Sequence, residues 1–144
     1  MERKRGYCGE CGAWIGLDAG DLCAPCAQRR ARANAALLRC TDAARQRLAS
    51  GAYAEAERIL SDCTQRGLES VDAYALRILA ITEQWNTDVL PSAATLDLLE
   101  RLCSRMESIA TAKTRLQCVS VRTALNLYRD YAAARRTRTG EDTP

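Results

Sequence analysis

Histidine is absent from this chain of 144 residues, and so is phenylalanine. The absence of histidine removes the commonest general base and the usual serine or cysteine catalytic triads. It also means that any zinc site must be built from cysteines, because mixed cysteine and histidine sites are excluded. No phosphate-binding loop or nucleophile motif appears in the sequence. We therefore expect a protein that is not an enzyme, with no catalytic residues and no small-molecule substrate.

Aromatic residues make up only 5% of the chain, and only three prolines interrupt it, whereas hydrophobic residues as a whole reach 47%. Alanine and leucine, both strong helix formers, supply most of the hydrophobic positions. These proportions exclude a wholly disordered chain and favour a mainly α fold. No apolar run reaches the ~18 residues of a membrane helix, and the N-terminus lacks the apolar segment of a secretory signal. We therefore expect a cytoplasmic protein with no membrane partner.

Apolar residues at helical spacing predict five helices with short connections. The predicted helices span residues 26–49, 53–66, 71–85, a fourth segment that begins at Ser92, and residues 111–136. Ser70 and Ser92 are the predicted N-caps of the third and fourth helices. Five such helices are expected to form an antiparallel hairpin stack or an ordinary bundle. The predicted apolar face of the fifth helix consists of Leu116, Ala124, Leu127, Tyr128 and Tyr131.

Two Cys-x-x-Cys pairs lie near the N-terminus, separated by eleven residues. Zinc binds four thiolates in a tetrahedron, and a Cys-x-x-Cys turn brings two sulfurs within reach of one ion. A hairpin around Gly16 and Gly20 would bring the second pair back to the first. Four thiolates leave no open coordination position, so we expect one structural Zn²⁺ rather than a catalytic one. The alternative is two disulfides or free thiols, which the expected reducing compartment disfavours. The predicted metal ligands are Cys8, Cys11, Cys23 and Cys26.

The remaining cysteines are scattered singly through the predicted helices. A lone cysteine in a helix behaves as a small hydrophobic residue. We therefore predict that all of them are buried in the helical body: Cys40, Cys63, Cys103 and Cys118.

Two family resemblances follow from these motifs. Residues 8–26, with a cysteine knuckle and a ligand pair at a helix start, resemble the treble-clef and zinc-ribbon class of zinc fingers. The segment from Leu48 to Leu60, with Gly51 ending one helix and Tyr53 opening the next, makes residues 37–81 resemble tetratricopeptide repeats. The second resemblance implies that a concave face binds a peptide or protein. The chain then divides into a finger with a basic lead (1–26), a helical body (27–136) and a disordered tail (137–144).

Charge is distributed unevenly along the chain. Residues 1–50 have nine basic and five acidic residues, residues 51–110 have five and ten, and residues 111–144 have seven and three. In the fifth helix, arginines recur every seven residues and therefore share one face. These arginines either brace the acidic middle, where Glu55 and Glu69 are among the available acids, or bind an acidic partner. They are Arg115, Arg122, Arg129 and Arg136.

A second row of arginines, Arg29, Arg32 and Arg39, lies on the first helix, which begins at the zinc site. Trp14, between the two cysteine pairs, either fills the small core of the finger or forms the tip of a contact surface. We expect a non-enzymatic, zinc-containing regulatory or adaptor protein that binds another protein or a multiprotein complex, and inhibition of a host complex is one form that this role can take. The alternative is a protein that binds DNA or RNA through the finger and the arginine rows.

Overall fold

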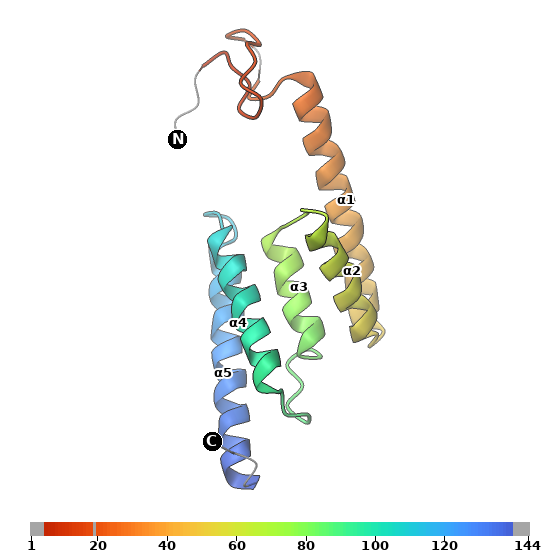
Figure 1. The fold of residues 1–144 in the computed structure, drawn as a ribbon, viewed down its shortest axis with the longest axis vertical. Helices are drawn as coiled ribbons and strands as arrows, with labels where there is room; N and C mark the ends of the chain where they lie inside the picture. Colours follow the sequence, from red (N-terminus) through yellow and green to blue (C-terminus); the bar gives the residue numbers. More distant parts are fainter. Residues whose placement is uncertain (1–4, 19, 140–144) are drawn as a thin grey trace. The chain divides into compact units, whose positions relative to one another are not determined.

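The computed structural model describes residues 5–18 and 20–139, and these form a mainly helical structure (Figure 1). The chain divides into two compact units, Met1–Leu38 and Arg39–Pro144. The predicted mainly α fold with five helices is confirmed, while the predicted division into finger, body and tail stays a prediction. None of the helices in the described ranges is long and apolar enough to cross a bilayer. The helices are α1 (Ala24–Ala49), α2 (Tyr53–Gln65), α3 (Val71–Ile81), α4 (Ala93–Ser108) and α5 (Arg115–Thr139).

Local capping signals in the sequence set several helix ends correctly. The Ser70 hydroxyl accepts a hydrogen bond of 3.0 Å from the Ala73 amide at the start of α3. The Ser92 hydroxyl does the same for the Thr95 amide, at 3.1 Å, at the start of α4. Each bond satisfies an amide that the first turn of a helix leaves without a backbone partner. Both predicted N-caps are therefore confirmed.

The predicted end of the third helix is wrong. The helix ends at Ile81 and not at residue 85. Glu83, Gln84 and Trp85 have φ values of 51°, 58° and 61°, a left-handed conformation that no α-helix continues. The turn brings the Trp85 ring within 5.7 Å of the Tyr128 ring, centroid to centroid. The left-handed turn thus occurs together with a contact between residues far apart in the sequence, which the local sequence pattern could not predict.

The fifth helix is also displaced from its predicted bounds. It begins at Arg115 rather than residue 111, because a threonine turn precedes it. In this turn the Thr111 amide donates a hydrogen bond of 2.8 Å to the Thr114 hydroxyl. At its other end α5 continues to Thr139, beyond the expected end at Arg136. The prediction of a disordered tail is therefore wrong for residues 137–139, which are helical, and residues 140–144 lie outside the described residues.

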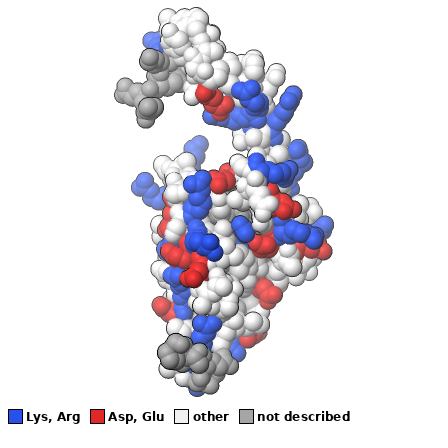
Figure 2. All heavy atoms as spheres, viewed as in Figure 1, with Lys and Arg blue, Asp and Glu red and all other residues white. Residues whose placement is uncertain are grey.

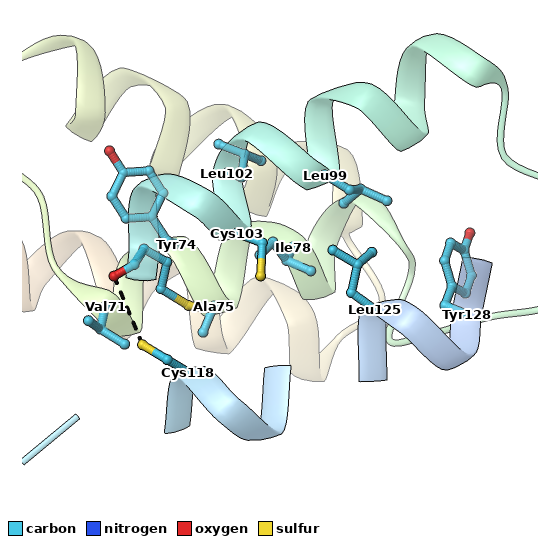
Figure 3. Close-up of a cluster of buried hydrophobic side chains, with 11 residues drawn as sticks. Val71, Tyr74, Ala75, Ile78, Leu99, Leu102, Cys103, Cys118, Leu125 and Tyr128 are labelled. Carbon is cyan, nitrogen blue, oxygen red and sulfur yellow. Dashed lines mark hydrogen bonds between the residues drawn. The ribbon is translucent and has the colours of Figure 1, made fainter. Parts of the chain in front are cut away.

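The core of the unit Arg39–Pro144 lies between α3, α4 and α5 (Figure 3). Ile78 of α3, Leu99 and Met106 of α4, and Leu125 of α5 are completely buried at its centre. Ile78, Leu99 and Met106 recur at helical spacing with other apolar residues of their helices, whereas Leu125 is not on the face that the sequence analysis predicted for the fifth helix. The α2 side chains Ala56, Leu60 and Cys63 are also fully buried, as the spacing predicts.

The predicted inward face of α5 is wrong in three of its members. Leu116 is 77% exposed, Leu127 is 65% exposed and Tyr131 is 45% exposed. The residues of α5 that do pack inward are Cys118, Leu125, Tyr128 and Ala132. Hydrophobic periodicity alone allows either of two stripes of this helix to face the core, because between Leu116 and Ala132 both stripes consist of uncharged residues. Packing against α3 and α4 selects the stripe of which the predicted apolar face included only Tyr128.

Three of the four scattered cysteines are buried, as predicted, and Cys40 is half-buried. Burial raises the pKa of Cys63 to about 11 and that of Cys103 to about 11. Both thiols are therefore protonated at neutral pH, which makes them poor nucleophiles and poor metal ligands. The role of these residues in the helical unit is packing.

Candidate metal centre

The first cysteine pair lies on a tight knuckle in the unit Met1–Leu38. The Cys8 amide donates a hydrogen bond of 2.8 Å to the Ala13 carbonyl, and the Gly12 amide donates one of 3.1 Å to the Cys8 carbonyl. Tyr7 and Trp14 form an antiparallel bridge where the knuckle closes. Gly12 has φ +76°, which glycine adopts without steric cost. The knuckle therefore folds Cys8 and Cys11 toward the same side.

Within the described residues, the antiparallel backbone pairing does not lie around Gly16 and Gly20, where the hairpin was predicted. The antiparallel bridge spans the first cysteine pair itself, from Tyr7 to Trp14. The loop between the two pairs is fastened instead by a bond of 2.8 Å from the Gly9 amide to the Asp21 carbonyl. This bond fixes the loop close to the second pair, so a full hairpin is not needed to bring the four cysteines together.

The second cysteine pair lies at the beginning of α1. Cys23 precedes the helix, and its carbonyl accepts a bond of 2.9 Å from the Ala27 amide. Cys26 lies in the first turn, next to Pro25, whose missing amide proton costs nothing there. The amides at a helix N-terminus favour negative charge on nearby groups. The helix start therefore positions this pair of cysteines beside the first pair.

The four sulfurs converge on one point. The Sγ atoms of Cys8, Cys11, Cys23 and Cys26 all lie within 4.8 Å of one another, and those of Cys11 and Cys23 are 3.7 Å apart. Zinc–sulfur bonds of about 2.3 Å in a regular tetrahedron require sulfurs about 3.8 Å apart. The four cysteines are thus positioned to hold one metal ion. Four protein ligands would complete a tetrahedral shell, so the arrangement fits a structural ion.

Backbone amides and neighbouring thiols shift the pKa values of two cysteines of the cluster in opposite directions. Hydrogen bonds from the amides of Cys11 and Cys23 lower the pKa of Cys8 to about 5. Side-chain hydrogen bonding with Cys23, together with burial, raises the pKa of Cys26 to about 12. The Arg29 guanidinium donates to the Cys26 sulfur at 2.9 Å. One thiol thus holds a proton that a bound metal ion would displace, because metal ligation needs the thiolate.

Apolar side chains lie on the surface beside the metal cluster. Trp14 is 60% exposed, and its ring contacts that of Tyr7 edge-on at a centroid distance of 5.0 Å. Leu17, on the loop between the pairs, is 57% exposed. Of the two roles considered for Trp14, its exposure resembles the tip of a contact surface more than the filling of a small core. The unit therefore presents an aromatic and aliphatic surface that the sequence alone did not reveal.

The arginine row of α5 lies mostly against neighbouring acids and carbonyls. The Arg122 guanidinium bonds Glu100 at 2.6 Å and Glu107 at 2.5 Å, and Arg129 reaches Glu100 at 3.2 Å. The Arg136 guanidinium donates to the Pro91 carbonyl. Figure 2 shows basic and acidic side chains side by side over the helical unit. These contacts resemble the bracing alternative of the sequence analysis more than an open binding face.

The acids that hold this row were missed by the sequence analysis. Glu100 and Glu107 of α4 are seven residues apart, which is also the separation of Arg122 and Arg129. Two helices that run antiparallel bring such rows into register, because each row occupies one face. The signal was present in the sequence, but recognising it requires knowing that α4 and α5 pair.

The acids that the sequence analysis named as possible partners bind arginines outside α5. Arg47 bonds Glu55 at 2.9 Å and Arg105 bonds Glu69 at 2.6 Å. The hydrogen bond from Arg105 holds the pKa of the Glu69 carboxyl below its usual range. Most acidic residues of the segment 51–110 thus form ion pairs with arginines of the same chain.

The arginines predicted on the first helix have different surroundings. Arg29 contacts the metal cluster through Cys26, whereas Arg32 and Arg39 are exposed on α1. The neighbouring Arg30 forms an ion pair of 2.7 Å with Glu10 on the knuckle. Three predicted partner-binding arginines therefore do not share one environment, and their role in binding stays a prediction.

No protein-family model, curated protein or solved structure matches this chain. The resemblances to zinc fingers and tetratricopeptide repeats therefore rest on the residues quoted for them and stay predictions. The four-cysteine cluster and the helical unit are established by the geometry described above.

Proposed function

We propose that the protein is a non-enzymatic adaptor in which a structural zinc ion holds an apolar surface for binding another protein. The observation that carries this proposal is the exposure of Trp14 and Leu17 next to the four-cysteine cluster. Large apolar side chains gathered at a surface mark sites of protein contact, and tryptophan is enriched among the residues that dominate such contacts. The segment has little core of its own, so metal binding would supply its folding free energy.

Zinc is the metal we propose because of the ligand set. Four thiolates in a tetrahedral arrangement favour zinc over magnesium or calcium, which prefer oxygen ligands. Elemental analysis of protein purified without chelator should find one zinc per chain. Preparations with less than about half an equivalent, or with iron in its place, would contradict the assignment.

The alternative function is nucleic-acid binding. The exposed Arg32 and Arg39 of α1 support it, since phosphate contacts come mainly from such side chains. The internal contacts of Arg122, Arg129 and Arg136 support the protein-binding proposal instead. Phosphate contacts release counterions, so a nucleic-acid binder should show an affinity that falls steeply with salt.

A photo-crosslinking experiment separates the two functions. A benzoylphenylalanine replacing Leu17 should capture a protein in the native cell, and the product should survive nuclease treatment. The matched control carries the same group at Gln28, an exposed polar position of the same unit, and should capture little. Capture of nucleic acid at both positions, with strong salt dependence, would favour the alternative and contradict the proposal.

A further inference from the structure

The α5 helix has a second uncharged face, whose five residues are all exposed. At about 100° per residue, its five members fall within about 80° of one another. α5 packs against α3 and α4 through its other side. None of the five is charged, and Leu116 and Leu127 are among the most exposed large hydrophobic residues described. We name this face the outer stripe, and it consists of Leu116, Ser120, Thr123, Leu127 and Tyr131.

The outer stripe is arranged symmetrically along the helix. Leu116 and Tyr131 are equally distant from the point between Thr123 and its neighbour, and so are Ser120 and Leu127. A second α5 running antiparallel, related by a two-fold axis at that point, would place Leu116 against Tyr131 of the second copy. It would also place Ser120 against Leu127 of the second copy. The large residues thus meet at the ends, and small ones lie at the crossing, where helices approach most closely.

Hollows beside the stripe fit this arrangement. A hollow of about 260 Å³ is lined by Ser120 and Ala124 of α5 and by Leu79 and Trp85 on the α3 side. In the antiparallel pair, Leu127 of the second copy lies opposite Ser120, at the edge of this hollow. A second hollow of about 330 Å³ shares Trp85 and Ala124 and continues along Leu127. Leu127 of one copy therefore lies opposite a hollow in the other copy. This is the shape complementarity that a two-fold contact requires.

Two charges on one flank of the stripe add to the complementarity. Arg115 and Asp130 are exposed, and within the residues that the structure describes neither forms an ion pair. They lie on the same side of the outer stripe, about 22 Å apart along the helix. A two-fold axis perpendicular to α5 brings this flank against the same flank of the second copy. Arg115 then comes within about one helical turn of Asp130 of the second copy, and the reverse pair forms as well.

We propose that two copies of this chain associate through the outer stripes of α5, with the helices antiparallel. A second copy is the occupant because the face complements itself in size, in shape and in charge. The area is that of one helix face, which is smaller than the ~800 Å² per partner of a standard stable interface. We therefore expect a dimer that dissociates in the micromolar range.

Reversing the charge of Arg115 or Asp130 tests the antiparallel arrangement specifically, because only this arrangement places the two residues opposite each other. Arg115→Asp places like charges opposite one another twice in its own dimer, and Asp130→Arg does the same. Each variant alone should dimerise at least tenfold more weakly than the parent in sedimentation velocity. A mixture of the two variants restores both opposite-charge pairs, so native mass spectrometry should find the heterodimer in excess over either homodimer. A statistical mixture, or homodimers as strong as the parent, would overturn the proposal.

An apolar substitution tests the stripe itself. Leu127→Asn should leave the chain monomeric at concentrations where the parent is dimeric. The matched control is Val89→Asn, an equally exposed apolar position of the same unit outside the stripe, and it should dimerise like the parent. Unchanged helical circular dichroism confirms that both variants fold. A parent that stays monomeric up to several hundred micromolar overturns the proposal. A Leu127→Asn variant that still dimerises but no longer binds some other protein overturns it as well.

Discussion

The contrast between two leucines of α5 gives the sharpest test of the fold. Leu125 is completely buried between α3, α4 and α5, whereas Leu127, two residues later, is 65% exposed. Truncation of a fully buried leucine to alanine costs about 2–5 kcal/mol, through lost burial and the cavity left behind. Leu125 lies at the centre of this core, and we expect about 3 kcal/mol for Leu125→Ala, within that range. For Leu127→Ala we expect less than about 0.5 kcal/mol, because that side chain already faces solvent.

Urea unfolding followed by circular dichroism at 222 nm measures both values. The two variants are matched, since both remove the same atoms from the same helix and leave helix propensity equal. The measurement belongs at a protein concentration well below the dissociation constant of the proposed dimer, so that association through the outer stripe contributes nothing to stability. If Leu127→Ala costs as much as Leu125→Ala, the inward face of α5 is assigned wrongly and the sequence-based face was right.

Three further predictions concern charge, metal and backbone. Glu100, whose pKa the Arg122 hydrogen bond lowers, stabilises the fold above the unfolded pKa of about 4.3 and loses this effect as pH falls. Glu100→Gln should therefore lower the unfolding free energy by about 0.5–1 kcal/mol at pH 7 and should match the parent at a pH low enough to protonate Glu100 in the folded state. Zinc removal by a chelator should speed amide exchange in residues 5–23 while α2 to α5 keep their protection. Gly6→Ala places a methyl 2.5 Å from the Trp14 ring, at φ +87°, and should weaken zinc binding about tenfold, whereas Gly20→Ala meets nothing.

The sequence predicted the helices of this chain well because their signals are local. Ser70 and Ser92 cap their helices through bonds to amides three residues away. Gly51 and Gly67 follow α1 and α2 in the left-handed conformation that ends a helix. The cysteine spacing was equally informative, because two Cys-x-x-Cys turns bring four sulfurs within reach of one ion with little help from the rest of the fold.

The inward face of α5 could not be predicted by the same reasoning. Both the outer stripe and the packed stripe lack charge, so hydrophobic periodicity gives two answers for one helix. The packed stripe includes Cys118 and Ala132, which contribute less apolar area than Leu116 and Leu127. The choice is made by how α3 and α4 fit against α5. The same ambiguity is informative once the structure is known, because the rejected stripe remains as an apolar surface.

The arginine row shows how a correct pattern can mislead about function. Its seven-residue spacing does place four arginines on one face of α5, but the face is turned toward α4. The pairs Arg122–Glu107 and Arg129–Glu100 share one antiparallel register, since each step up α5 is a step down α4. When this register is continued in both directions, the first and last arginines of the α5 row fall at or beyond the two ends of α4.

The ends of the register explain the two outer arginines. Arg136 falls level with the beginning of α4, where no acid lies opposite, and it bonds the Pro91 carbonyl instead. Arg115 falls beyond the last turn of α4, at the threonine turn, and stays exposed. One arginine of the four is thus left for intermolecular contact. A row of like charges is therefore best judged against the acid spacing of every helix that can pair with it before a phosphate partner is inferred.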